Sequence, residues 1–360
     1  MRLARWRVRL CELHFAQPLR TARGTFTTRT SALLELTDDD GVTGHGEAAP
    51  WPGFAGESAE AAALALREAC SRLSGTDLEA VADPMGAAPP KGLQTAQAAL
   101  HAALWDLSAR RAGRPLAEHL GLRCGGCAGP PLAEVAVGRL LTATDPEALR
   151  AQAAQARAAG YRAVKLKLGA QPLATDVACA RAVREAIGPE VRLRGDANGA
   201  WDRDAAVAAL DALAEFGFEY VEQPLPAESL ADLAMLRRRS PLRLAADESL
   251  VDAEHARRLL AAEAIDVAVL KPAFLGGPAL ALALAACARA AGVAVVFSHA
   301  MESAVGARHA LHCAAAWGDR SAVHGLCTAG LFADDVAEPV GSVAGRAILS
   351  AAAGIGLVPP

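Results

Sequence analysis

The sequence predicts an α/β protein: a modified TIM barrel of the (β/α)7β type, preceded by an N-terminal α+β capping domain. From about residue 134 onward, eight apolar, β-branched runs alternate with Ala-, Leu- and Arg-rich stretches of helical character. Seven helices between eight strands return the chain to the same end of the sheet, which requires parallel pairing and favours a closed barrel. An open doubly wound sheet is the alternative, but no Gly-x-Gly-x-x-Gly motif follows the first strand.

The elements of the barrel follow from these runs. The eight expected strands are short apolar segments bounded by turn residues, at 134–140, 162–168, 190–196, 218–224, 242–248, 265–271, 293–299 and 322–328. The clearest helix, expected over 145–160, begins with Asp145 and Pro146 and ends at Gly160. Asp before the helix, Pro in its first turn and Gly after its end are the preferred order of cap residues.

Residues 1–130 lack this alternation and are expected to form the capping domain. Residues 30–50 predict two antiparallel strands joined by a turn at Asp40 and Gly41, and two helices are expected at 58–73 and 93–113. The barrel is expected over residues 131–328. The tail, residues 329–360, has no barrel-like alternation and is expected to pack back onto the capping domain.

Composition excludes several classes of protein. The chain has 360 residues, of which 52% are hydrophobic and 21% charged, so a large core is expected and disorder is not. The net charge is −4 and no Lys/Arg-rich block occurs, which argues against a nucleic-acid or membrane-surface partner. The N-terminus lacks a signal-peptide core and no long uncharged apolar span occurs, so a cytoplasmic location is expected. Of eight cysteines, only Cys124 and Cys127 form a CxxC motif, and without a second ligand pair we interpret it as a loop.

Charged residues end four successive strands of the expected barrel. Asp196, Glu222, Asp247 and Lys271 follow one another at steps of 26, 25 and 24 residues, each about one strand–helix unit. Side chains at the carboxyl ends of barrel strands meet at one rim, so three carboxylates would converge and repel one another unless a cation lies among them. An all-oxygen set favours Mg²⁺, with Mn²⁺ second. Glu248 is expected to turn away because side chains alternate along a strand.

Two lysines supply the complementary charge. Lys165 and Lys167 lie one residue apart near the end of the second strand, so they share a face, and Lys271 is expected on the opposite side of the barrel mouth. A divalent cation could hold a substrate carboxylate while an amine removes the proton from the adjacent carbon. Such a reaction passes through an enediolate, and the charge of Lys165 would lower the pKa of its neighbour.

Five motifs connect these residues to a known family. They are KLK (165–167), DANGAW (196–201), VEQPL (221–225), ADES (246–249) and LKPAFLGG (270–277). At these motifs, and over essentially its whole length, the chain resembles the muconate-lactonizing branch of the enolase superfamily.

The resemblance implies a role for each residue of the site. It implies Mg²⁺ ligands at Asp196, Glu222 and Asp247, with Asn198 as a nearby polar partner. It makes Lys167 the base that removes the α-proton and Lys165 its electrostatic assistant, while Lys271 is a second acid/base or a stabilising cation. Segments 20–26 and 49–58 are similar to the two loops that close over the substrate in this family.

Within the branch, GEAAPWPGFAGES, RGDANGAW and FSHAMESAVG are most similar to the o-succinylbenzoate synthases, which dehydrate a cyclohexadiene carboxylate through one lysine. An N-acylamino acid racemase, a dipeptide epimerase and a muconate cycloisomerase are the alternatives, and a non-catalytic barrel would be expected to lack a ligand or a lysine. Asp334-Asp335 differs from the Asp-x-Asp pattern of dipeptide epimerases. The expected partner is a small-molecule carboxylate, and whether the chain forms a homo-oligomer is left open. The candidate substrate-binding residues are Asn198, Arg194, Ser298, Ser303, Gly53 and Phe54.

Overall fold

The structure is a computed structural model that describes residues 1–21, 24–51, 56–78, 93–326 and 330–357. Its N-terminal part is an antiparallel sheet of order β1-β2-β3, against which helices α1 and α2 pack. The expected turn and both expected helices are confirmed, and a further helix, α3, follows them. The bounds are β1 (Leu3–Thr21), β2 (Gly24–Asp38), β3 (Thr43–Ala48), α1 (Ala59–Leu73), α2 (Gln94–Arg111) and α3 (Leu116–Arg123).

Two glycines let strand β3 lie directly on helix α2. A Cβ atom on Gly44 would lie 2.3 Å from the carbonyl oxygen of Ala103, and one on Gly46 would lie 2.0 Å from that of Ala99. Only glycine permits so close an approach of strand and helix backbones. The approach fixes the height of β3 and with it the position of Glu47, the next residue along the strand.

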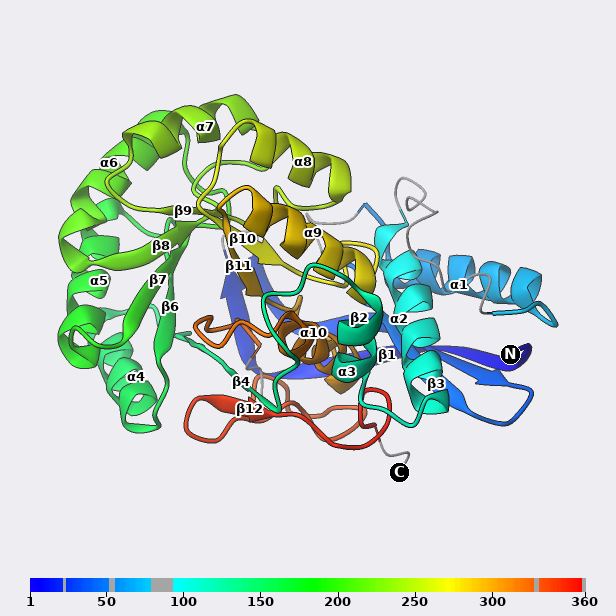
Figure 1. Ribbon diagram of the computed structural model, residues 1–360. Coiled ribbons are helices and arrows are strands. Elements are labelled where there is room, and N and C mark those ends of the chain that lie inside the picture. Colours follow the sequence, from blue (N-terminus) through cyan, green and yellow to red (C-terminus); the bar gives the residue numbers. More distant parts are fainter. Residues whose placement is uncertain (22–23, 52–55, 79–92, 327–329, 358–360) are drawn as a thin grey trace.

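The barrel is a parallel sheet of seven strands in the order β11-β10-β9-β8-β7-β6-β5. The strands are β5 (Arg139–Leu140), β6 (Ala163–Lys167), β7 (Arg192–Asp196), β8 (Phe218–Glu222), β9 (Leu244–Ala246), β10 (Val267–Leu270) and β11 (Ala294–Phe297). The helices are α4 (Pro146–Ala158), α5 (Leu173–Ile187), α6 (Arg203–Leu213), the 3-10 helix η1 (Ala214–Phe216), α7 (Leu230–Arg239), α8 (Ala253–Ala261), α9 (Pro278–Ala290) and α10 (Ala304–Trp317). Figure 1 shows α4 to α8 as an arc outside β6 to β9, with the antiparallel sheet, α1 and α2 on the other side. The predicted α/β architecture is confirmed.

The first and eighth expected strands differ from the prediction. The run 134–140 divides into β4 (Glu134–Ala136) and β5, and β4 pairs with β12 (Arg346–Ile348) from the tail. The described part of 322–328 forms no strand: His324 bridges to Val137 and Gly325 to Ser298. A single β-bridge on each side does not form a ladder, so the described residues close the barrel at this point through isolated bridges. The imidazole of His324 adds one more, because its Nδ1 accepts the N–H of Phe297 at 3.0 Å.

The tail contacts both the antiparallel sheet region and the barrel. The N–H of Ile355 donates to a carboxylate oxygen of Asp106 on α2 at 2.7 Å, and the N–H of Ala333 donates to the carbonyl of His14 on β1 at 2.8 Å. Strand β12 pairs with β4 at the start of the barrel. The tail therefore joins the two halves of the chain.

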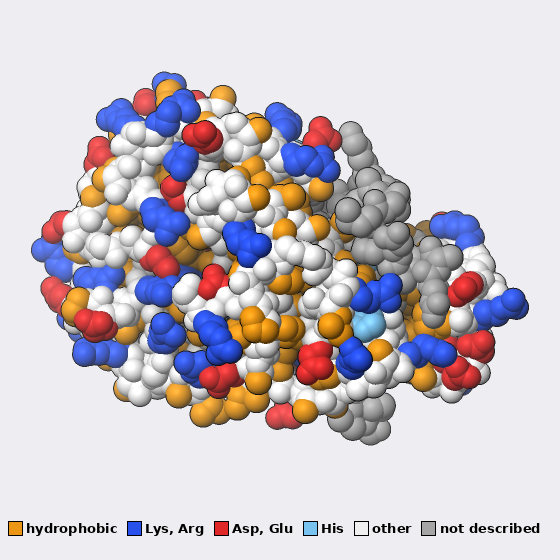
Figure 2. Space-filling view, in the orientation of Figure 1, with side chains coloured by type: hydrophobic (Ala, Val, Ile, Leu, Met, Phe, Trp, Pro, Cys, Tyr) orange, Lys and Arg blue, Asp and Glu red, His pale blue; other side chains and the backbone are white. Residues whose placement is uncertain are grey.

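None of the helices in the described ranges is long and apolar enough to cross a bilayer. On the face shown in Figure 2, acidic and basic side chains are interspersed.

Four helices are preceded by a capping residue whose side chain accepts a backbone N–H group of the first turn. The caps of α4, α6, α8 and α10 are Asp145, Asp202, Asp252 and Ser303.

Candidate active site

Strand register brings the charged residues into one row. Lys167 on β6 lies beside Asp196 on β7, and Asp196 lies beside Glu222 on β8. Lys165 lies beside Arg194, one layer deeper in the barrel. Because aligned residues of parallel strands point to the same face, the row lies inside the barrel at the carboxyl ends of the strands.

The amines and carboxylates contact one another directly. The Nζ of Lys165 lies 3.0 Å from Oε1 of Glu222 and 3.2 Å from Oδ2 of Asp196. The Nζ of Lys167 donates to Asp196 at 2.8 Å and to Oδ1 of Asn198 at 2.7 Å.

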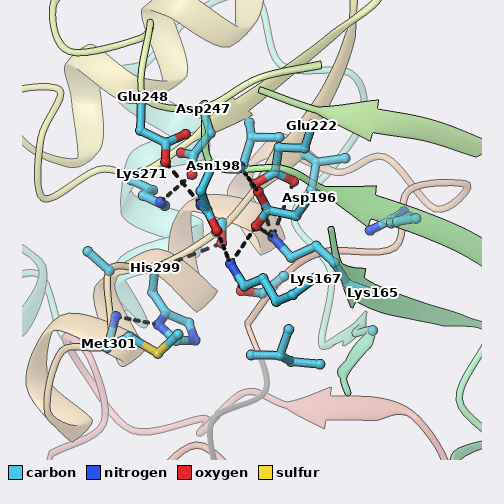
Figure 3. Close-up of a pocket in the computed structure, with 18 of the residues that line it drawn as sticks. Lys165, Lys167, Asp196, Asn198, Glu222, Asp247, Glu248, Lys271, His299 and Met301 are labelled. Carbon is cyan, nitrogen blue, oxygen red and sulfur yellow. Dashed lines mark hydrogen bonds and ion pairs between the residues drawn. The ribbon is translucent and has the colours of Figure 1, made fainter. Parts of the chain in front are cut away.

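On the other side of the pocket, Nζ of Lys271 lies 2.6 Å from Oδ2 of Asp247. Figure 3 shows Lys271 on one side and Lys165 and Lys167 on the other, with the carboxylates between them. The expected arrangement of opposed lysines around acidic residues is therefore present in the geometry.

Burial and ion pairing shift the titration of these groups in opposite directions. Burial raises the pKa of Glu222 to about 7, although Lys165 acts against this shift. Burial alone would also raise the pKa of Asp196, but the charges of Lys167 and Lys165 outweigh it and hold that pKa below its usual range. Burial would lower the pKa of Lys165 and Lys271, but the surrounding carboxylates raise both.

The donor set fits a hard divalent cation. Within the described part of the chain, Oδ1 of Asp247 and Oε2 of Glu248 are buried and have no hydrogen-bond partner. Buried carboxylate oxygens without a partner are costly, and a divalent ion satisfies them. Among the described residues, the carboxylate oxygens of Asp196, Glu222 and Asp247 do not all lie within 4.8 Å of one another, so these side chains would have to move closer together to share an ion. The amine of Lys165 lies between Asp196 and Glu222, and that of Lys271 lies beside Asp247.

The group that does meet the 4.8 Å distance, among the described residues, is Asp38, Asp39 and Asp40 in the turn between β2 and β3. Asp38 and Asp40 both pair with Arg111, at 2.5 and 2.6 Å, and Asp39 and Asp40 are exposed. The carboxylate of Asp38 also accepts the N–H groups of Asp40 and Val42. These contacts account for the cluster as a stabilised turn.

The remaining candidates have different positions. Ser298 lines the pocket, and its hydroxyl donates to the carbonyl of Gly325 at 3.1 Å. Arg194 also lines the pocket, but its guanidinium is paired with Glu219 at 2.6 Å. Ser303 does not belong to the described lining: it caps α10, and its hydroxyl donates to Glu47 at 2.5 Å. Gly53 and Phe54, and residues 22–23 and 52–55 of the two expected lid loops, lie outside the described residues.

Three residues of the site were not anticipated. Glu248 lines the pocket and accepts from Nδ2 of Asn198 at 3.0 Å, so the expectation that it turns away is wrong. Strand β9 ends at Ala246, and strand alternation does not apply beyond it. His299 and Met301 also line the pocket; both lie in the FSHAMESAVG motif, but neither was named as a site residue. The other side chains of the wall are mostly apolar: Leu19, Trp51, Leu140, Val269, Phe274 and Val296.

Comparison with known families agrees with this site. The model of the enolase C-terminal domain-like family matches residues 148–359, and that of the mandelate racemase/muconate lactonizing enzyme N-terminal domain matches residues 6–121. The chain therefore belongs to the mandelate racemase/muconate lactonizing group of the enolase superfamily.

Individual relatives differ in the activity that their names state. An o-succinylbenzoate synthase from Mycobacterium tuberculosis is 44% identical over 224 residues, 61% of this chain and 66% of that protein, so the match spans just under two thirds of the relative. A hydrophobic dipeptide epimerase from Enterococcus faecalis is 29% identical over 341 residues, 91% of this chain and 93% of the relative. The solved muconate lactonizing enzyme from Pseudomonas fluorescens, in complex with muconolactone, is 27% identical with a TM-score of 0.90, over 100% of this chain and 97% of that one.

Proposed function

We propose that this chain is an o-succinylbenzoate synthase, which converts 2-succinyl-6-hydroxy-2,4-cyclohexadiene-1-carboxylate into o-succinylbenzoate and water. The pairing of Lys167 with Asp196 at the barrel mouth carries the proposal, because it supplies an amine beside the carboxylates that would bind a divalent cation for the substrate carboxylate. The 44% identity to the mycobacterial synthase supports the choice of reaction. The expected place in menaquinone biosynthesis follows from that choice and from nothing else in the chain.

The proposed reaction needs one base and one acid on the same face of the ring. In its neutral form, Lys167 takes the proton from the carbon that bears the substrate carboxylate, and the enediolate forms. The ammonium of Lys167 then returns a proton to the departing hydroxide, so water leaves and the ring becomes aromatic. The Nζ of Lys167 donates to Asn198 and Asp196, and these contacts hold the amine at the pocket.

Asp196, Glu222 and Asp247 are the proposed ligands of Mg²⁺, with Mn²⁺ as the alternative ion. A bound divalent ion would supply positive charge to the substrate carboxylate and so favour the doubly negative enediolate. Lys165 contacts two of these ligands and keeps its positive charge, which serves the same purpose. Lys271 faces the pocket from the other side, where its charge would stabilise the enediolate.

Two observations favour this reaction over dipeptide epimerisation. Asp334 accepts from the backbone and Nδ1 of His14, and Asp335 accepts the N–H of Ala304, so both acids have partners away from the described pocket lining. The carboxyl groups in that lining are the four at the strand ends. A dipeptide ammonium would therefore meet no separate anionic side chain among the described residues.

Racemisation of N-acylamino acids is the second candidate, because such substrates carry no ammonium. The position of Lys271 favours it: an amine on each side of the pocket could remove the α-proton from one face and return it to the other. Both reactions use the same base, so they are separated by substrate and not by geometry.

A direct assay of dehydration tests the proposal. Purified protein with Mg²⁺ is incubated with the cyclohexadiene carboxylate, and the aromatic product is followed by chromatography. Lys167→Met should lower kcat about 10³-fold, the usual contribution of general base catalysis. Arg192→Met is the control, because Arg192 lies at the other end of β7 and pairs with Glu219. Full activity of Lys167→Met would reject the base. Absence of dehydration by the wild type, with rapid α-exchange of N-succinyl amino acids in D₂O, would favour the racemase.

A further inference from the structure

A buried arginine connects the N-terminal sheet with the rim of the barrel. Arg29 on β2 is only 4% exposed. Its guanidinium donates to the carbonyls of Ala49, at 2.6 Å, and Pro50, which follow β3. The same group donates to the carbonyls of Ala300, at 3.2 Å, and Met301, at 3.3 Å, which follow β11. One side chain therefore binds two segments that are about 250 residues apart in the sequence.

Residues next to both of these segments line the pocket. The guanidinium carbon of Arg29 lies 4.8 Å from the ring centre of Trp51, which lines the pocket. Met301 and its neighbour His299 line the pocket from the barrel side. A change at Arg29 would reach the pocket through both walls, although Arg29 itself is not among the described lining residues.

The turn after β11 has a strained residue and hydrogen bonds of its own. Met301 has a φ of +59°, in the left-handed region that a residue with a side chain adopts at a cost. Its N–H donates to Nδ1 of His299 at 3.1 Å, and the carboxylate of Glu302 accepts the N–H of Ala300. The orientation of the imidazole is thus coupled to the turn.

The N-terminal sheet also binds the other end of the same turn. Glu47 on β3 is buried and accepts the N–H of Ser303 at 3.0 Å, its hydroxyl at 2.5 Å and the N–H of Gly306 at 2.9 Å. Arg29 thus binds carbonyls at the start of the turn while Glu47 binds N–H groups at its end. Burial lowers the pKa of Arg29 to about 10, and the nearby charges of Glu302 and Glu47 oppose part of that shift.

We propose that Arg29 is a positioning residue, which holds the 299–301 turn and Trp51 together as the wall against which the substrate lies. The planar guanidinium presents five donors in a fixed fork and stacks on the indole, whereas a lysine ammonium is a compact point charge with three donors. The consequence for catalysis depends on the proposed synthase activity, but the positioning itself does not.

The first experiment measures amide hydrogen exchange of the metal-free protein without any ligand. Arg29→Lys should speed exchange in a peptide covering 298–306 about tenfold, as expected when charged hydrogen bonds to a local segment are lost. Arg184→Lys is the matched control: Arg184 donates to the carbonyls of Phe216, Gly188, Val191 and Gly217 between helix ends and strand starts, away from the pocket. Equal exchange of 298–306 in the two variants would overturn the proposal.

The second experiment uses kinetics with the cyclohexadiene carboxylate. Arg29→Lys should raise KM about tenfold and lower kcat less, because a displaced wall weakens substrate binding while Lys167 remains in place. Arg184→Lys should change neither. Loss of kcat with unchanged KM, in folded Arg29→Lys, would overturn the proposal. If the wild type lacks synthase activity but the exchange difference is found, the proposed function fails while the positioning role of Arg29 stands.

Discussion

The carboxylate site predicts that Mg²⁺ stabilises this protein against heat. Four buried carboxyls, those of Asp196, Glu222, Asp247 and Glu248, share the pocket with three lysines, and burial raises the pKa of Glu222 to about 7. A divalent cation would favour the ionised form of these carboxyls. An ion at 100 times its Kd stabilises the folded state by about 2.7 kcal/mol. At about 2.1 cal/mol/K per residue, the unfolding entropy of 360 residues is about 0.76 kcal/mol/K, so Tm should rise by about 3.6 °C.

Calorimetry of protein treated with a chelator and then titrated with Mg²⁺ measures this shift. Glu222→Gln should abolish most of it, because a ligand charge is removed from the site. Asp40→Asn is the control, because Asp40 belongs to the turn cluster that pairs with Arg111. A shift that survives Glu222→Gln but disappears in Asp40→Asn would show that the exposed turn binds the ion, and the assignment of the strand-end carboxylates would be refuted.

Three further predictions concern the second lysine, the barrel closure and the sheet. Lys271→Ala should lower the kcat of dehydration about 10- to 100-fold, less than Lys167→Met, since Lys271 is proposed to stabilise charge without moving a proton; equal losses would indicate that Lys271 also transfers a proton. Burial lowers the pKa of His324 to about 3. The buried neutral imidazole therefore contributes its full stability above pH 6.5, and the free energy of unfolding should fall as pH decreases toward 3, because the unfolded state then binds the proton more readily. His324→Asn should reduce that loss in urea unfolding at pH 4 to 7, and an unchanged profile would contradict it. Gly46→Ala should cost about 3 kcal/mol by overpacking against α2, measured by urea unfolding, whereas Gly125→Ala, where a Cβ meets nothing within 4 Å, should be neutral.

Much of the site could be predicted because strand-end positions repeat with the strand–helix unit. The spacing of Asp196, Glu222 and Asp247 places each at the end of its own strand, and the structure has Asp196 and Glu222 aligned in register. The two-residue spacing of Lys165 and Lys167 likewise predicts a shared face, and both contact Asp196. Such predictions succeed because local backbone geometry determines them.

Residues beyond strand ends could not be placed in this way. Glu248 follows β9 in a segment without strand geometry, so alternation gave the wrong side. The described part of the expected last strand, up to residue 326, failed for a related reason: a strand requires a ladder of partners, and the described residues around His324 form single bridges on each side. In both cases the outcome depended on neighbouring elements and not on the segment itself.

The sequence by itself determined the alternation of strands and helices in the barrel, the carboxylates and lysines at its rim, and the caps of its helices. These features depend on contacts close along the chain or on a regular repeat. Tertiary structure decided which side chains complete the pocket. Arg29 reaches Met301 across 272 positions, and Glu47 reaches Ser303 across 256. No local pattern encodes such contacts, since they arise only when burial forces the polar groups of two distant segments to satisfy one another.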